Sequence, residues 1–292
     1  MFKASYVLVT AARNEERFIR KTIDSVTTQT VLPQKWVIVS DGSTDRTEDI
    51  VNQEAATHTW IELVCMPRLA SRQFSNSALC LNLGYQRVKN QEFDIIGFLD
   101  ADISFEKDYF EFLISKFLKF PRLGVAGTPY LEGEYDISKN IFYDRQHVHG
   151  ACQCFRRKCF EEIGGFIPIQ IGGYDKVAVT ISRINGWETR SFDENKFVHH
   201  RRIGFGGQNI LSVRLKYGHK DYILGNHPLW EIFRAIYQMV HKPYFVGGLL
   251  LLIGYFFSLL SRKKRPVPAE YIAFHRQEEI RKLKSIFRRF LR

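Results

Sequence analysis

The chain has 292 residues, of which 45% are hydrophobic and 14% aromatic, so it is long and apolar enough to bury a large core. Its net charge is +11, and residues 261–292 contribute +8 of that charge, with 11 Lys or Arg against 3 Glu. A nucleic-acid-binding protein would spread Lys and Arg over its folded face, so we expect no nucleic-acid partner and a tail that faces an anionic membrane surface.

Short apolar runs and helical patterns alternate along the first hundred residues. Strand, loop and helix repeated in this order predict a parallel sheet with right-handed crossovers. We therefore expect an α/β fold with a Rossmann-like, mostly parallel sheet flanked by helices. The predicted strands span 6–9, 36–39, 61–64 and 95–99, and the predicted helices between them end near Val26 or span 46–56 and 76–88.

Polar side chains follow three of these predicted strands. Arg13 and Glu15 follow the first strand, and Asp41 ends the second. Asp100 and Asp102 come at the end of the fourth. Because ligands bind beyond the carboxyl ends of parallel strands, we expect these residues to lie at one edge of the sheet. Residues i and i+2 of a strand project to the same side, so Asp100 and Asp102 can converge on one hard cation or one diphosphate.

The glycine motifs of two common nucleotide-binding classes are absent from the sequence. No G-x-G-x-x-G follows the first strand, and no G-x-x-x-x-G-K-[ST] occurs anywhere. Dinucleotide-dependent oxidoreductases and P-loop phosphotransferases are therefore disfavoured. A nucleotide site in this chain would be built from side chains and a metal ion.

The strand-end motifs resemble those of the family-two nucleotide-sugar glycosyltransferases with the GT-A fold. The resemblance covers roughly residues 5–205, and its segments occur in the order that the family has. The matching segments are residues 7–16, 39–45 and 98–102, followed by Gly150, 155–157, 163–166, 173–175 and 186–187.

The resemblance assigns the nucleoside of the donor to the loops after the first two strands. Ala11, Arg13 and Glu15 would line the nucleoside pocket, with the Glu15 carboxylate near the ribose or base. Asp41 would accept a hydrogen bond from the base, which suits the N3–H of uracil or thymine and favours a UDP-sugar. From the residues alone, the segment from Asp41 to Asp45 can also be a turn followed by a helix cap.

The resemblance also implies a metal site and a phosphate contact. Asp102 would be the direct metal ligand, and Asp100 would contact the ribose or the water shell of the metal. Mg²⁺ or Mn²⁺ suits this site because hard cations prefer oxygen ligands and a diphosphate supplies more of them. Of the histidine pair at 199–200 we choose His200 as a further ligand, although both can also be surface residues. Arg201 or the next arginine would pair with phosphate oxygens.

Asp175 stands where the family keeps the base that takes the proton from the acceptor hydroxyl. One base without a covalent nucleophile implies direct displacement with inversion at the anomeric carbon. Many members carry two adjacent carboxylates at this point, whereas this chain has Tyr174 before Asp175. From its position alone, Asp175 can also be the N-cap of a helix over 176–184.

Residues 226–292 form the predicted C-terminal region, after a catalytic domain at 1–225. Residues 245–260 carry no charge, but this run is shorter than the ~20 residues of a spanning helix. A basic cluster follows at once, so we expect a re-entrant or interfacial hairpin and a basic helix over 270–292 on anionic headgroups. The alternative is the buried core helix of a soluble dimer. With no signal-peptide pattern, we expect the cytoplasmic face of a membrane.

The expected activity is transfer of a single sugar from a nucleotide-sugar donor to a lipid-linked or envelope-glycan acceptor. A single transfer is preferred because the Q-x-x-R-W motif of processive polymer synthases is absent. One alternative is transfer to a polyprenyl monophosphate, and another is an inactive, membrane-docked scaffold of the same fold. The sequence leaves the donor sugar, the linkage and the oligomeric state open.

Overall fold

The computed structural model describes residues 4–67, 74–140, 142–201 and 209–290. By its contacts the chain divides into two compact units, residues 1–201 and 202–292. This packing boundary precedes residue 225, because the helix over 210–223 packs with the helix over 246–260. The division of function at residue 225 stays a prediction.

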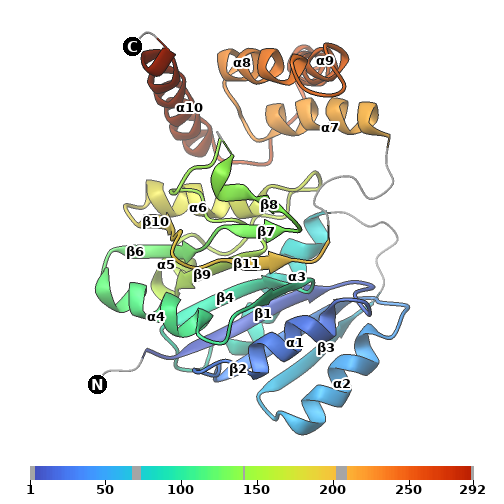
Figure 1. The fold of residues 1–292 in the computed structure, drawn as a ribbon, viewed down its shortest axis with the longest axis vertical. Helices are drawn as coiled ribbons and strands as arrows, with labels where there is room; N and C mark the ends of the chain where they lie inside the picture. Colours follow the sequence, from blue (N-terminus) through green and yellow to red (C-terminus); the bar gives the residue numbers. More distant parts are fainter. Residues whose placement is uncertain (1–3, 68–73, 141, 202–208, 291–292) are drawn as a thin grey trace. The chain divides into compact units, whose positions relative to one another are not determined.

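The first unit is built around a central sheet (Figure 1). Its described strands are β1 (Tyr6–Ala12), β2 (Lys35–Asp41), β3 (Ile61–Met66), β4 (Ile95–Asp100), β6 (Leu123–Gly127), β9 (Cys152–Arg156) and β10 (Glu188–Ser191). They lie across the sheet in the order β10-β6-β9-β4-β1-β2-β3. β9 pairs antiparallel with β4 and β6, and the other neighbouring pairs are parallel. The predicted α/β fold with a mostly parallel sheet is therefore confirmed.

The core lies on both faces of this sheet because alternate strand residues point to opposite sides. Leu8 belongs to one buried cluster, and its neighbours Val7 and Val9 belong to the other. Strands buried on both faces need continuous apolar runs, which is the pattern that predicted them. The first cluster includes residues of α1 (Ile19–Thr27), α2 (Thr47–Thr57) and α4 (Tyr109–Lys119), and the second includes residues of α3 (Phe74–Val88), α5 (Arg157–Glu162) and α6 (Tyr174–Ile184).

A small second sheet places β11, near the end of the first unit, beside the segment that follows β4. Its described strands lie in the order β5 (Ile103–Phe105), β11 (Phe197–His199), β7 (Tyr130–Glu132) and β8 (Tyr135–Asp136), and the 3-10 helix η1 (Ile137–Lys139) follows β8. β11 pairs antiparallel with β5, with His199 opposite Ile103. The N–H of His200 donates to the carbonyl oxygen of Asp102 at 2.9 Å. This pairing fixes which residues of the two segments meet.

The second unit consists, in its described part, of α7 (Ile210–Ile223), α8 (Pro228–Met239), α9 (Val246–Leu260) and α10 (Ala269–Phe290). Two glycines of α9 allow close packing. A Cβ atom on Gly254 would clash with the carbonyl oxygen of Leu215 in α7, and one on Gly248 with that of Ala235 in α8. The helix backbones therefore touch, which only glycine permits. Within the described ranges, every helix is too short or too polar to cross a membrane.

Candidate functional site

Four carboxylates act on one another at the carboxyl edge of the central sheet. Asp100 ends β4, Asp102 follows it, Glu15 lies in the loop after β1, and Asp175 lies in the first turn of α6. Burial and, after it, the charges of Asp102, Asp175 and Glu15 raise the pKa of Asp100 to about 8, although Arg201 opposes the shift. Glu15, Asp100 and Asp102, three of the residues that the sequence predicts at one edge of the sheet, thus lie near one another. Such a concentration of negative charge favours binding of a divalent cation.

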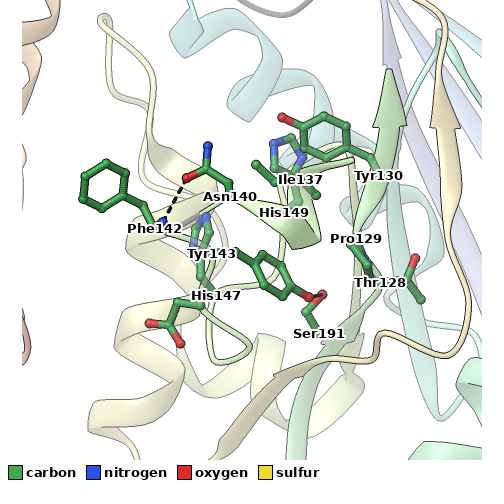
Figure 2. A pocket seen from close by; sticks show the side chains of 11 residues that line it. Thr128, Pro129, Tyr130, Ile137, Asn140, Phe142, Tyr143, His147, His149 and Ser191 are labelled. Atoms are coloured by element: carbon green, nitrogen blue, oxygen red, sulfur yellow. Dashed lines mark hydrogen bonds between the residues drawn. The ribbon is translucent and has the colours of Figure 1, made fainter. Parts of the chain in front are cut away.

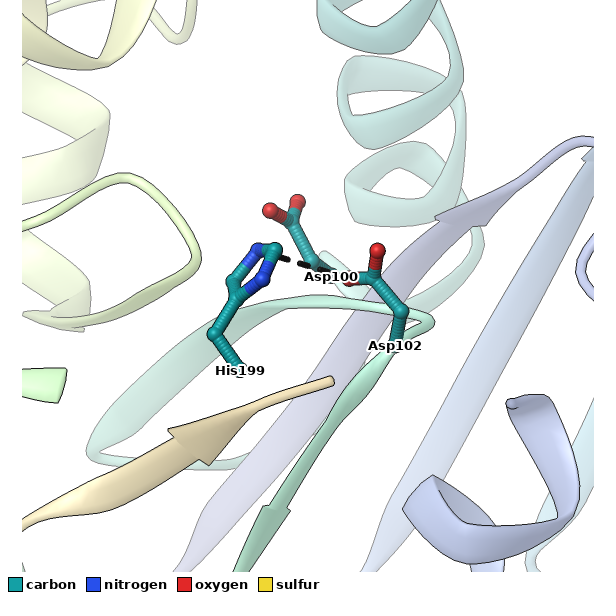
Figure 3. Close-up of side chains that lie close together, drawn as sticks. All are labelled: Asp100, Asp102 and His199. Atoms are coloured by element: carbon teal, nitrogen blue, oxygen red, sulfur yellow. Dashed lines mark ion pairs between the residues drawn. The ribbon is translucent and has the colours of Figure 1, made fainter. Parts of the chain in front are cut away.

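Asp100, Asp102 and His199 form a group that could hold a metal ion (Figure 3), with one potential ligand atom from each within 4.8 Å of the others. Nε2 of His199 lies 3.6 Å from Oδ1 of Asp102. Its other ring nitrogen, Nδ1, lies 2.5 Å from the carbonyl oxygen of Arg201. A carbonyl oxygen only accepts, so Nδ1 carries the hydrogen and Nε2 keeps the lone pair that a metal ligand needs. Two carboxylates and an imidazole fit Mn²⁺ or Mg²⁺, with the nitrogen favouring Mn²⁺.

His200, which we predicted as the metal ligand, lies elsewhere. Its Nε2 is 2.8 Å from Oγ of Ser104, and its ring stacks on Phe18 with the centroids 6.3 Å apart. The cause is the alternation of β11, which buries Phe197 and His199 and exposes Val198 between them. The described geometry therefore favours His199 over His200.

Arg201 lies across two of the carboxylates. Its guanidinium forms an ion pair with Glu15, and its Nε lies 3.3 Å from Oδ2 of Asp102. The same guanidinium stands over the ring of Phe18, 5.4 Å from the centroid. The structure thus brings together three predicted site residues, from the loop after β1, the end of β4 and the end of the first unit. A guanidinium in this position suits the bidentate recognition of phosphate oxygens.

Asp41 occupies the other side of the predicted nucleotide site. Its Oδ2 accepts hydrogen bonds from Arg13 at 2.8 Å and from Asn76 at 3.2 Å. Its Oδ1 is buried and has no hydrogen-bond partner among the described residues. Buried carboxylate oxygens are nearly always paired, so this free acceptor fits an N–H donor of a ligand. Ala11, the remaining predicted residue of this pocket, lies in β1 opposite Asp100 of β4.

Asp175 follows two glycines with positive φ, Gly172 at 81° and Gly173 at 95°. Gly173 is the N-cap of α6 and Asp175 belongs to the first turn, so Asp175 is not the helix cap that its position also allowed. Its carboxylate packs against Gly150, where an added Cβ would lie 2.5 Å from Oδ2. Because its charge also raises the pKa of Asp100, Asp175 faces the same site as the metal group.

Residues 7–139 match the model of the family described as Glycosyl transferase family 2. This part of the chain is therefore similar to the family 2 glycosyltransferases. The match includes Asp41, Asp100 and Asp102, and it ends before Asp175 and His199, whose assignment rests on the geometry above.

Two curated glycan synthases are similar in sequence to part of this chain. The chondroitin synthase of Pasteurella multocida (strain Pm70) is 31% identical over 117 residues, which is 40% of this chain and 11% of that protein. The poly-beta-1,6-N-acetyl-D-glucosamine synthase of Staphylococcus epidermidis is 27% identical over 132 residues, 45% of this chain and 30% of that protein. The chain therefore spans only a minor part of the length of these relatives.

Two solved structures share the fold. The mannosyltransferase PcManGT from Pyrobaculum calidifontis, in complex with GDP-Man and Mn²⁺, gives a TM-score of 0.61 at 17% identity, covering 90% of this chain and 89% of its own. Residues 1–349 of S. aureus TarS, in complex with UDP-GlcNAc, give a TM-score of 0.56 at 12% identity. This match covers 88% of the present chain and 73% of the TarS chain. At these identities the likeness concerns the fold, and it confirms the GT-A fold expected from the sequence.

Sequence reasoning missed four residues of this region, namely His199, Asn76, His147 and His149. A predicted strand over 197–199 would have placed His199 on the same side as the apolar Phe197. Asn76 lies at the start of a predicted helix, where a polar residue carries no particular signal. His147 and His149 lie in a segment to which no motif pointed.

Proposed function

We propose that the chain is a metal-dependent, inverting glycosyltransferase that moves a single sugar from a nucleotide-sugar donor, with a UDP-sugar favoured, to a lipid-linked or envelope-glycan acceptor. The observation that carries this proposal is the group of Asp100, Asp102 and His199 beside the charge of Asp175. The donors bound to two proteins of the same fold, GDP-Man and UDP-GlcNAc, support the class of donor.

Each residue of the site has a task in this reaction. Mg²⁺ or Mn²⁺ held by Asp100, Asp102 and His199 would neutralise the charge that builds on the departing nucleoside diphosphate. Arg201 pairs with phosphate oxygens, and the free Oδ1 of Asp41 accepts the N3–H of the base. Asp175 takes the proton of the acceptor hydroxyl as that oxygen attacks the anomeric carbon, opposite the leaving group, so the configuration inverts.

The test is to incubate the purified protein with a panel of nucleotide sugars and Mn²⁺ or Mg²⁺. Nucleoside diphosphate release and the melting temperature are measured for the wild type and for Asp102→Ala. We expect one UDP-sugar to be cleaved and to stabilise the protein, and both effects to vanish in the variant. A wild type that no nucleotide stabilises would be a scaffold of the same fold, and full activity in Asp102→Ala would remove the metal from the mechanism.

We also propose that the second unit docks on an anionic membrane surface, with the glycosyltransferase domain on the cytoplasmic face. In α9, Phe257 is 65% exposed and Leu260 is 81% exposed. Three exposed cations, Arg262, Lys263 and Lys264, follow this helix directly. Apolar side chains next to cations suit the boundary between headgroups and acyl chains.

Vesicle co-sedimentation tests this docking. The protein should pellet with vesicles of phosphatidylcholine and phosphatidylglycerol, and less with phosphatidylcholine alone, because only the former offers negative charge. The double variant Phe257→Ser, Leu260→Ser should lose binding, whereas Tyr135→Ser, an exposed aromatic of the first unit, should keep it. Equal pelleting of the double variant and the wild type would contradict the proposal.

A further inference from the structure

A pocket of about 320 Å³ in the first unit lies outside the metal group and the nucleoside side chains (Figure 2). Its described wall comes from the segment over 128–130, η1, residues 140 and 142–149, and the end of β10. Aromatic and imidazole rings make up much of its wall, which includes Tyr130, Phe142, Tyr143, His147 and His149. A concave site with aromatic walls and a few polar groups is the usual form of a small-molecule site.

The pocket lies beside Asp175. His147 and His149 belong to its wall, and the charge of Asp175 acts on both, opposing the fall of their pKa values. Gly150, the next residue along the chain, packs directly against the Asp175 carboxylate. A molecule held in this pocket is therefore next to the group that we assign as the base.

The wall of the pocket is held in place by contacts of its own. The hydroxyl of Tyr143 donates to Oδ1 of Asp193 at 2.7 Å and lies 3.0 Å from Oγ of Ser191. The ring of Tyr130 lies 4.4 Å, centroid to centroid, from that of His149. Aromatic rings fixed in this way present flat apolar faces without further ordering, which lowers the entropic cost of binding.

No positive charge lines the pocket. The described residues of its wall include no Lys or Arg, but they do include the acidic Asp144. Burial lowers the pKa of His147 and of His149 to about 4, so both are neutral at pH 7. The charges of Lys176 and Arg183 act on His147, but neither residue lines the pocket. Arg183 donates to the carbonyl oxygen of Gln146 at 3.1 Å, and Arg145 donates to Asp193 at 2.7 Å.

We propose that this pocket holds an uncharged sugar ring of the acceptor and so selects a neutral saccharide over a phosphate or a uronate. The inference rests on the proposed function. The rings of Tyr130 and Tyr143 pack against the apolar face of the sugar, while His147, His149 and Asn140 bond its hydroxyls. A phosphate or carboxylate here would be buried without a cation and would face Asp144 and Asp175.

In the transfer step, one hydroxyl of the acceptor lies at Asp175. The oxygen of this hydroxyl forms the new bond to the anomeric carbon of the donor, and the hydroxyl proton passes to Asp175. The bond between that carbon and the diphosphate breaks, and its electron pair leaves with the nucleoside diphosphate.

The test compares neutral and charged acceptors with the full chain and its donor. The probes are p-nitrophenyl glycosides of glucose, galactose, mannose and N-acetylglucosamine, the matching glucuronide, and undecaprenyl phosphate. We expect at least one neutral probe to bind in ligand-observed NMR and to be glycosylated, with kcat/KM at least about tenfold above those of the glucuronide and the phosphate. His147→Ala and His149→Ala should raise the KM of the neutral probe about tenfold or more and change the donor KM less than about twofold. Gln146→Ala, an exposed neighbour that does not line the pocket, should change neither constant.

Preferred transfer to the glucuronide or to undecaprenyl phosphate would overturn the inference, as would neutral probes that do not bind at all. The same holds for pocket variants that keep the melting temperature and the acceptor KM of the wild type. These results are distinct from a failure of the proposed function, in which the wild type releases no nucleotide from any donor, even to water.

Discussion

Nε2 of His199 lies 3.6 Å from Oδ1 of Asp102, and Nδ1 of the same ring is turned to the carbonyl oxygen of Arg201. The 3.6 Å separation is too long for a good hydrogen bond. It suits two ligands of one cation, since atoms that each lie about 2.1 Å from an ion are about 3 Å or more apart. The backbone contact of Nδ1 fixes both the tautomer and the orientation that such a ligand requires.

The first prediction distinguishes the two adjacent histidines. His199→Gln should weaken Mn²⁺ binding by about tenfold or more, because it removes a nitrogen ligand. His200→Gln should leave the Mn²⁺ affinity nearly unchanged, since His200 contacts Ser104 and Phe18 instead. Calorimetric titration of Mn²⁺ in the presence of UDP measures both variants. Loss of affinity in His200→Gln alone would reverse the assignment.

The second prediction separates the base from the metal ligand. Asp175→Asn should lower kcat by about 10²- to 10⁴-fold, the usual contribution of a general base, and keep the affinity for UDP and Mn²⁺. Asp102→Asn should instead lose Mn²⁺-dependent nucleotide binding. Steady-state kinetics with the active donor, together with calorimetry, give the two patterns. If Asp175→Asn turns over at the wild-type rate, another group takes the proton.

The third prediction concerns the free oxygen of Asp41. Asp41→Asn should weaken UDP binding by about 1–3 kcal/mol, because an amide can place a donor where the base needs an acceptor. It also loses the charge that pairs with Arg13. Asp45→Asn is the matched control in the same loop, where Asp45 bonds the N–H and hydroxyl of Thr47. That variant should lose stability and keep its UDP affinity, as calorimetry and thermal melting will report.

The fourth prediction tests the glycine contacts of α9. Gly254→Ala should destabilise the second unit by about 1–3 kcal/mol, because the added Cβ meets the backbone of α7 at Leu215. Gly247→Ala in the same helix is the control, since its Cβ would lie 3.3 Å from the nearest atom, a ring carbon of Pro243. Helix propensity favours alanine at both positions, so it does not explain a difference. Similar denaturation midpoints for the two variants would show that α7 and α9 can separate freely.

The fifth prediction is a pH dependence of stability in the second unit. Glu231 is fully buried, and burial followed by the charge of Asp221 raises the pKa of this carboxyl from 4.5 to about 9. Between these values the folded state binds one more proton than the unfolded state, so the free energy of unfolding falls as the pH rises.

Glu231→Gln keeps the size of the side chain and removes this titration. The variant should therefore unfold with a weaker pH dependence between pH 5 and 9, and it should be more stable than the wild type at pH 8. Circular dichroism during urea denaturation at several pH values measures this. The exposed Glu270 of α10 provides the control Glu270→Gln, which should keep the wild-type pH profile. A steeper profile in Glu231→Gln would contradict the assignment.

The sequence by itself determined the elements that depend on local pattern. Continuous apolar runs predicted β1, β2 and β4, because a strand buried on both faces has no polar alternation. The spacing of Asp100 and Asp102 placed both carboxylates on one side of a strand end, and the order of the motifs indicated the family. None of these predictions required knowledge of which distant segments meet.

Only the tertiary structure decided what depends on pairing between distant segments. The register of β11 on β5 selected His199 over His200, since a shift of one residue reverses the side to which every side chain points. The packing of α7 with α9 placed α7 in the second unit, because Gly254 lets the backbones of the two helices touch. The pocket beside Asp175 exists only because the segment over 142–149 folds against β7, where the ring of His149 meets that of Tyr130, and no local spacing of its histidines encodes that contact.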